Sequence, residues 1–201
     1  MPVYEKILKL PFITELAAGT LDKDIFMYYI RQDSLYLKDY ARVMDIMAAR
    51  ISEPELSAMF GRFAKENIEA EKSLHAFFGE PLSCVQSPTC LFLSSHLYRQ
   101  AAEPRLEVAL ASVLPCFLVY ERVGEHILSA CVKEGNPYMK WIETYSDDGF
   151  SASVAELSSI CNSFAEENPA SRKDMAEAFV TGTKLEWMFW NSAYIMEEWK
   201  I

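Results

Sequence analysis

Apolar side chains recur with a period close to 3.6 residues along almost the whole chain, with polar and charged positions between them. This spacing is typical of amphipathic helices, whereas a half-buried strand would alternate every second residue. No alternating run is long enough for a strand, and no internal repeat is present. The pattern therefore predicts an all-α protein.

Turn and capping residues divide this pattern into helices. Gly19 ends a first helix, Asp22 can cap a second that runs to about residue 49, and Pro54 begins a third that runs to about residue 78. After a loop over residues 79–88, the predicted helices span about 90–101, 106–133 with a kink at Pro115, a short one through 141–145, 151–166 and 171–199. Short connections between long helices predict a compact bundle forming a single domain over residues 1–201.

Charge and composition narrow the possible partners. The formal net charge is −10 and the sequence pI is about 4.8, so the chain is not expected to bind nucleic acid. No basic run attracts an anionic membrane, and the longest apolar stretch, residues 106–120, is shorter than the roughly 20 residues of a membrane span. Five cysteines without a CxxC pair argue against a disulfide framework and a structural zinc site. We expect a protein of the reducing cytoplasm.

Asp33 is the first polar side chain on an otherwise apolar helix face, which it shares with Tyr36 and Tyr40 at spacings of three and seven residues. A carboxylate on such a face needs a hydrogen-bond donor. The donor is either a neighbouring protein group or an amino or amidine group of a ligand, and the sequence leaves both possibilities open.

Cys116 directly follows Pro115 in an apolar run, and it shares a helix face with Tyr120 four residues later. A cysteine in such a helix is usually a small core residue. However, a proline inside a helix costs about 3 kcal/mol or more, which suggests that the chain shapes a site here. Cys116 is thus a candidate nucleophile as well as a core residue.

Glu186 in the last predicted helix is surrounded by large apolar side chains, among them Phe189 and Trp190. Burial among them would raise the pKa of its carboxyl group, which suits a general acid or base near neutral pH. A glutamate at the rim of the bundle fits the same pattern. The hydroxyls of Tyr98 and Tyr145 are further candidates.

A metal site is a weaker possibility. Glu71 and His75, four residues apart, together with His96 and His126 could supply oxygen and nitrogen ligands inside a bundle. The chain has no HExxH motif and no pair of ExxH motifs, and no histidine precedes His75 as an early haem ligand. We therefore predict neither a metal nor a haem.

Five segments in one order resemble the TenA (thiaminase II) family over nearly the full chain. They are residues 31–37, 95–99, 114–116, 141–145 and 186–190. The resemblance implies a haem-oxygenase-like bundle without haem or other cofactor, and it implies a homotetramer. It also implies an aminopyrimidine aminohydrolase, which converts 4-amino-5-aminomethyl-2-methylpyrimidine to the hydroxymethyl pyrimidine and ammonia and could also cleave thiamine.

The resemblance also implies roles for particular residues. Cys116 would add to the ring carbon next to the one bearing the aminomethyl group, and Glu186 would protonate the ring nitrogen. Asp33 would hold the exocyclic amino group and the adjacent ring nitrogen. The remaining substrate-binding residues carried over are Tyr36 and Tyr120, which would stack on the ring, Tyr145, which would hydrogen-bond Glu186, and Phe189.

Three positions depart from the family pattern. Leu10 stands where a histidine is usual, and Arg122 stands where a glutamate is usual. Leu93 replaces a tyrosine that faces the cysteine in many relatives, so the activation of Cys116 has to come from another group. Two alternatives remain beside the hydrolase: a metal-dependent oxidase using Glu71, His75 and His96, and a non-catalytic pyrimidine-binding protein.

Overall fold

The fold is a bundle of α-helices, and the described part of the chain contains no strand. The computed structural model describes residues 2–79 and 84–201, with the backbone alone at residues 67, 70, 71 and 75. Its elements in chain order are α1 (Pro2–Ile7), α2 (Pro11–Ala18), α3 (Lys23–Arg50), α4 (Pro54–Phe78), α5 (Pro88–Ala101), α6 (Leu106–Ala130), α7 (Met139–Thr144), α8 (Asp148–Glu167), the 3-10 turn η1 (Pro169–Ser171) and α9 (Arg172–Tyr194). The prediction of an all-α fold is confirmed.

Side-chain caps begin three of the helices. The Asp22 carboxylate accepts hydrogen bonds from the backbone N–H groups of Asp24 (2.7 Å) and Ile25 (3.4 Å) ahead of α3. Ser87 accepts from the N–H of Cys90 at the start of α5, and Asp147 begins α8 in the same way. The predicted start of the second long helix at Asp22 is confirmed.

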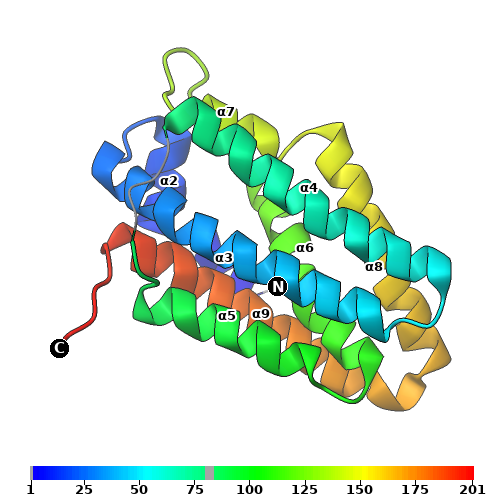
Figure 1. Cartoon of the computed structure of the whole chain (residues 1–201). Helices are drawn as coiled ribbons and strands as arrows, with labels where there is room; N and C mark the ends of the chain where they lie inside the picture. The colour runs from blue at the N-terminus through cyan, green and yellow to red at the C-terminus, as the bar shows by residue number, and fades with distance from the viewer. Residues whose placement is uncertain (1, 80–83) are drawn as a thin grey trace.

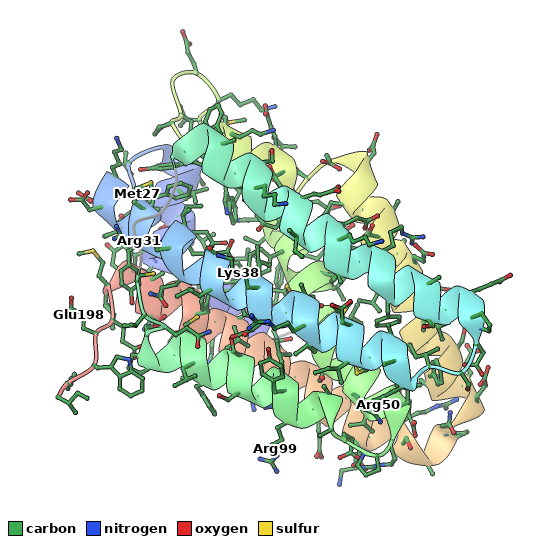
Figure 2. The ribbon with its side chains drawn as sticks, in the orientation of Figure 1. Met27, Arg31, Lys38, Arg50, Arg99 and Glu198 are labelled. Carbon is green, nitrogen blue, oxygen red and sulfur yellow. The ribbon has the colours of Figure 1, made fainter. Side chains whose placement is uncertain are left out.

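The long helices are arranged around one large buried core (Figure 1). α3 packs along α4 on one side and against α5 on the other, while α6 packs along α9 and α8. At the end of α3, Arg50 reaches the connection between α5 and α6, where its guanidinium donates to the carbonyl groups of Ala101 and Glu103 (Figure 2). Within the described ranges, no helix is long and apolar enough to cross a membrane.

The first and the last helix differ most from the predicted boundaries, and the others differ by a few residues. The first predicted helix is split in two, because Pro11 has no N–H to continue α1 and instead occupies the first turn of α2. The last helix ends at Tyr194 rather than near Trp199, since Met196 adopts a left-handed φ of 45°. The segment after it crosses the start of α5, where the Trp199 indole donates to the Gln86 carbonyl (2.9 Å). Residues 80–83 of the predicted loop lie outside the described residues.

Pro115 lies inside α6, which continues as a helix on both sides of it. The ring is accommodated by Gly182 of α9. A Cβ atom at Gly182 would lie 2.7 Å from Pro115 Cγ and 3.2 Å from the Ser112 carbonyl oxygen. The absence of a side chain at Gly182 therefore allows α9 to approach the turn of α6 that precedes Cys116.

We expect Gly182→Ala to lower the free energy of unfolding by about 1–3 kcal/mol, because the added methyl group must displace a proline ring held in a helix. Urea unfolding measures this change. The matched control is Gly61→Ala within α4, where an added Cβ meets nothing within 4 Å. This control should gain up to about 1 kcal/mol from helix propensity. Equal stability changes in the two variants would contradict the close approach at Pro115.

Candidate active site

A cavity of about 310 Å³ opens between α3, α4, α6 and the turn from α7 to α8. The lining residues from α3 and α6 are all buried, and we call this side of the cavity its buried end. The lining residues from α4 and α8 are exposed or half-buried. The residues that line it are Asp33, Tyr36, Leu37, Glu66, Cys116, Phe117, Tyr120, Thr144, Tyr145, Asp147, Gly149, Phe150 and Ser153. Its size and its aromatic walls suit a small ring compound.

Asp33 and Tyr36 reach the cavity from α3, one helical turn apart. Asp33 is only 3% exposed. The Tyr36 hydroxyl donates a hydrogen bond to Oε1 of Glu186 on α9, at 3.1 Å. The Phe189 ring packs against the Tyr36 ring with centroids 5.6 Å apart. Tyr36 thus links the cavity wall to the buried carboxyl group of Glu186.

Glu186 is 1% exposed, and its Oε2 atom has no hydrogen-bond partner in the described part of the chain. Burial raises the pKa of its carboxyl group to about 8. The hydrogen bond from Tyr36 opposes this rise, and the charge of Asp33 adds to it. A carboxyl group with this pKa can both give and take a proton near neutral pH.

Cys116 lines the cavity from α6. Burial raises the pKa of its thiol well above the ordinary value, and the negative charges of Glu186 and Asp33 raise it further. Hydrogen bonding by the hydroxyls of Tyr36 and Tyr40 acts in the opposite direction. The resting group is therefore a thiol, and its proton must leave before the sulfur can act as a nucleophile.

Aromatic side chains form the walls next to Cys116. The Tyr120 ring lies 5.0 Å from Tyr145 and 4.6 Å from Trp190, measured between centroids. Tyr145 can approach α6 because Gly124 has no side chain: a Cβ there would lie 2.6 Å from the Tyr145 carbonyl oxygen. The Tyr120 hydroxyl is buried and has no hydrogen-bond partner among the described residues.

The structure brings most of the predicted site residues together. Those that line the one cavity are Asp33, Tyr36, Cys116, Tyr120 and Tyr145. Glu186 lies behind Tyr36, and Phe189 supports the Tyr36 ring. One predicted contact differs: the hydroxyl that donates to Glu186 is that of Tyr36, not that of Tyr145. Tyr145 instead packs against Tyr120 and Trp141.

The departure at Leu93 has a structural counterpart. Leu93 is buried in α5 without a hydroxyl to offer, and Tyr98 donates to Asp39 at 3.0 Å, away from the cavity lining. The hydroxyl of Tyr40 lies near the Cys116 thiol instead, and it donates to the Val113 carbonyl at 2.7 Å. Tyr40 shares the helix face of Asp33, but its spacing in the sequence indicates no role in the site.

The other two departures lie away from the cavity lining. Leu10 is buried at the start of α2, and the exposed Arg122 pairs with Glu125 at 3.0 Å. Glu66, Asp147 and Ser153 line the cavity but were not anticipated, because acidic and hydroxyl side chains on exposed helix faces carry no distinguishing pattern.

The candidate metal ligands of the sequence are Glu71, His75, His96 and His126. The side chains of Glu71 and His75 lie outside the described residues. Elsewhere in the described chain, no three His, Cys, Asp or Glu side chains are grouped so that they could hold a metal ion. Burial and the neighbouring Arg99 lower the pKa of His96, whose side chain is not part of the cavity lining.

Known proteins similar to this chain agree with both the fold and the motifs. The sequence model of the TENA/THI-4/PQQC family matches residues 2–196. An aminopyrimidine aminohydrolase of Bacillus subtilis is 35% identical over 199 residues, covering 94% of this chain and 84% of the relative. A protein of the same name from Halalkalibacterium halodurans is 26% identical and covers 98% and 93%.

Solved structures support the expected architecture. A TenA homologue from Pyrococcus furiosus superposes with a TM-score of 0.86 at 20% identity, covering 96% of this chain and 94% of that chain. A domain with a heme oxygenase-like fold from Shewanella denitrificans gives 0.76 at 17% identity, covering 97% and 88%. The prediction of a haem-oxygenase-like bundle is confirmed, and the chain belongs to the TENA/THI-4/PQQC family.

Proposed function

We propose that this protein is a C–N hydrolase of thiamine salvage, an aminopyrimidine aminohydrolase. It replaces the amine of 4-amino-5-aminomethyl-2-methylpyrimidine with a hydroxyl group and releases ammonia, and it can also cleave thiamine. The observation that carries the proposal is that Cys116 and Asp33 line one cavity. Glu186 is joined to the wall of this cavity by the hydrogen bond from the Tyr36 hydroxyl. The 35% identity to a relative of that name supports it.

Binding of the ring follows from the shape of the cavity. The aminopyrimidine lies between aromatic walls that include Tyr36 and Tyr120. Asp33 accepts a hydrogen bond from the exocyclic amino group. The second oxygen of the Asp33 carboxyl group and the adjacent ring nitrogen share one proton. The two hydrogen bonds together hold the ring in the plane of the carboxyl group. This pairing fixes the ring so that the carbon to be attacked faces Cys116.

The chemistry begins with a proton transfer within the pair Cys116 and Glu186. Glu186 takes the thiol proton, the sulfur forms a bond to the ring carbon beside the one that carries the side chain, and Glu186 passes the proton to the ring nitrogen. The ring is then no longer aromatic, and its electrons expel ammonia as the C–N bond breaks. The exocyclic methylene that results accepts water, and the water proton leaves through Glu186. As the C–S bond breaks, the ring nitrogen gives up the proton that it gained and the sulfur takes one, which restores the aromatic ring and the thiol.

The pKa values in the site fit one shared proton. The thiol and the carboxyl group both resist ionisation because both are buried. In addition, the charge of Glu186 raises the pKa of the thiol, and the charge of Asp33 raises the pKa of the Glu186 carboxyl group. Glu186 has to release its own proton before it can take that of the thiol, and a pKa of about 8 allows this near neutral pH. The reactive state then carries one proton between the two groups, as thiol and carboxylate or as thiolate and acid. Movement of this proton needs no change in the total charge of the site.

The finer aspects of the proposal follow the family resemblance. We propose that the chain acts as a single catalytic domain in the cytoplasm, without a cofactor, and that it assembles as a homotetramer. Light scattering after size-exclusion chromatography measures the mass of the assembly directly, and a monomer at micromolar concentration would contradict the last point.

Ammonia release tests the function. We expect purified protein treated with a chelator to release one ammonia for each hydroxymethyl pyrimidine formed. Metal-free protein with full turnover ends the oxidase alternative, whereas activity that depends on bound iron or manganese would favour it. Binding of the pyrimidine without turnover would favour the non-catalytic alternative. The cavity around Cys116 favours the hydrolase over the metal-dependent oxidase and over the non-catalytic binding protein.

A further inference from the structure

The charged side chains that line the cavity are all acidic. They are Asp33 from α3, Glu66 from α4 and Asp147 at the start of α8. No lysine or arginine is among the described residues of the lining. The carboxyl group of Glu186 lies just behind Tyr36. A cavity with this lining favours a ligand that carries positive charge and disfavours an anionic one.

Three side chains away from the buried end form what we call the acidic rim. They are the carboxylates of Glu66 and Asp147 and the hydroxyl of Ser153. Glu66 is about 44% exposed, in contrast to Asp33. Its Oε2 atom accepts a hydrogen bond of 3.3 Å from Ser153 on α8, so the carboxylate reaches from α4 to α8. Asp147 accepts from the N–H of Phe150 at 2.8 Å. Both carboxylates are thereby held in place at the cavity.

The nearest guanidinium does not neutralise the acidic rim. Arg62 Nε lies 3.3 Å from Glu66 Oε1, but the same side chain also pairs with Glu156 on α8. One positive charge is thus shared by the carboxylates of Glu66 and Glu156, and Asp147 adds a further carboxylate to the cavity lining. The acidic rim keeps an excess of negative charge at neutral pH.

A second observation, at Tyr120, indicates that the cavity accepts a polar ligand. Tyr120 is 2% exposed, its ring lines the same cavity, and its hydroxyl has no hydrogen-bond partner in the described residues. Buried hydroxyl groups in folded proteins nearly always have a partner. A polar atom of a molecule bound at the buried end, near Asp33, would supply it.

We infer that the acidic rim binds the positively charged substituent of the substrate, either a protonated aminomethyl group or a quaternary ring nitrogen, and that it rejects phosphorylated pyrimidines. This inference rests on the proposed function. With the flat ring held at Asp33 and Cys116, the substituent extends toward Glu66 and Asp147. The charge of the departing group, rather than its shape, then determines which pyrimidines are bound well.

Two ligands that differ mainly in charge test this inference directly. The aminomethyl pyrimidine is a cation at neutral pH, and the hydroxymethyl pyrimidine is neutral. We expect the double variant Glu66→Gln, Asp147→Asn to bind the cationic ligand about 5- to 30-fold more weakly, with little change for the neutral one. Asparagine retains the helix cap at position 147, so the variant should fold. Calorimetry on a Cys116→Ser background measures both affinities without turnover.

Salt and phosphate provide independent measurements. Raising the salt concentration should weaken binding of the cationic ligand to the native rim more than to the double variant. The phosphate ester of the hydroxymethyl pyrimidine should bind more tightly to the double variant than to the native rim. The control is Glu177→Gln on α9, an exposed carboxylate that pairs with Lys173 away from the cavity. It should change none of these affinities.

The outcomes separate the inference from the proposed function. Suppose that the native enzyme releases ammonia, but the double variant binds the cationic and the neutral ligand with equal losses of affinity or with no loss. The acidic rim then does not discriminate by charge, and the inference is wrong. If the native enzyme releases no ammonia, the proposed function fails. The comparison of cationic and neutral ligands still decides the role of the rim in that case.

Discussion

We expect the Cys116→Ser protein to bind the aminomethyl pyrimidine and yet to turn it over on the order of 10³-fold or more slowly than the native protein. Serine preserves the size of the side chain in a wall built from Tyr36, Phe117 and Tyr120. Its hydroxyl group is far less acidic than a thiol, and Glu186 with a pKa of about 8 is too weak a base to ionise it. Binding through Asp33 should survive.

Steady-state ammonia release measures the loss, and calorimetry measures the binding that remains. The matched control is Cys161→Ser. Cys161 is also buried, and burial raises the pKa of its thiol to about 12, but it does not line the cavity. This variant should keep native turnover. Mass spectrometry of native protein quenched during turnover should detect an adduct on the peptide that contains Cys116. Native turnover by Cys116→Ser would rule out covalent addition.

The helices were predictable because each long helix has an apolar face, and capping residues or prolines mark where several of them begin. Asp22 caps α3 as the sequence suggested, and Pro54 begins α4. The end of α9 was not predictable. It depends on contacts with segments more than a hundred residues away, such as the hydrogen bond from Trp199 to the Gln86 carbonyl. Helical periodicity carries no information about such contacts.

In the candidate site, too, local spacing was predictable from the sequence and long-range packing was not. Asp33 and Tyr36 share a helix face, and the spacing of three residues alone reveals this. The hydrogen bond from Tyr36 to Glu186 joins residues 150 positions apart, so only the packing of α3 on α9 could reveal it. Glu66 and Asp147 resemble ordinary solvated acids in the sequence, and their role depends on the cavity between α4 and α8.

The Glu186→Gln protein should be more stable than the native protein at pH 8 and should lose about 10²- to 10⁴-fold in turnover. Glutamine has nearly the same shape, and its carbonyl oxygen can accept the Tyr36 hydrogen bond. It carries no ionisable group into the core. Urea unfolding of both proteins at pH 5 and pH 8, with kinetics on the same samples, measures the two effects.

The sign of the stability effect follows from proton binding. In the folded protein the Glu186 carboxyl keeps its proton up to a pKa of about 8, whereas in the unfolded chain its pKa is near the ordinary 4.5. The folded state therefore binds more protons between these values, and its stability falls as the pH rises through that window. At about 1.4 kcal/mol per pH unit, the cost accumulates to about 3–4 kcal/mol between pH 5 and pH 8.

The glutamine variant lacks this titration, so the two proteins should differ little in free energy of unfolding at pH 5 and much at pH 8. All other titrating groups are common to both proteins and cancel in the comparison. Parallel pH dependences would mean that the pKa of Glu186 is not raised in the folded protein, and the assignment of a buried, proton-holding carboxyl group would be wrong. A buried carboxyl group that destabilises the fold at neutral pH has no structural reason to be there, and proton transfer with Cys116 supplies a chemical one.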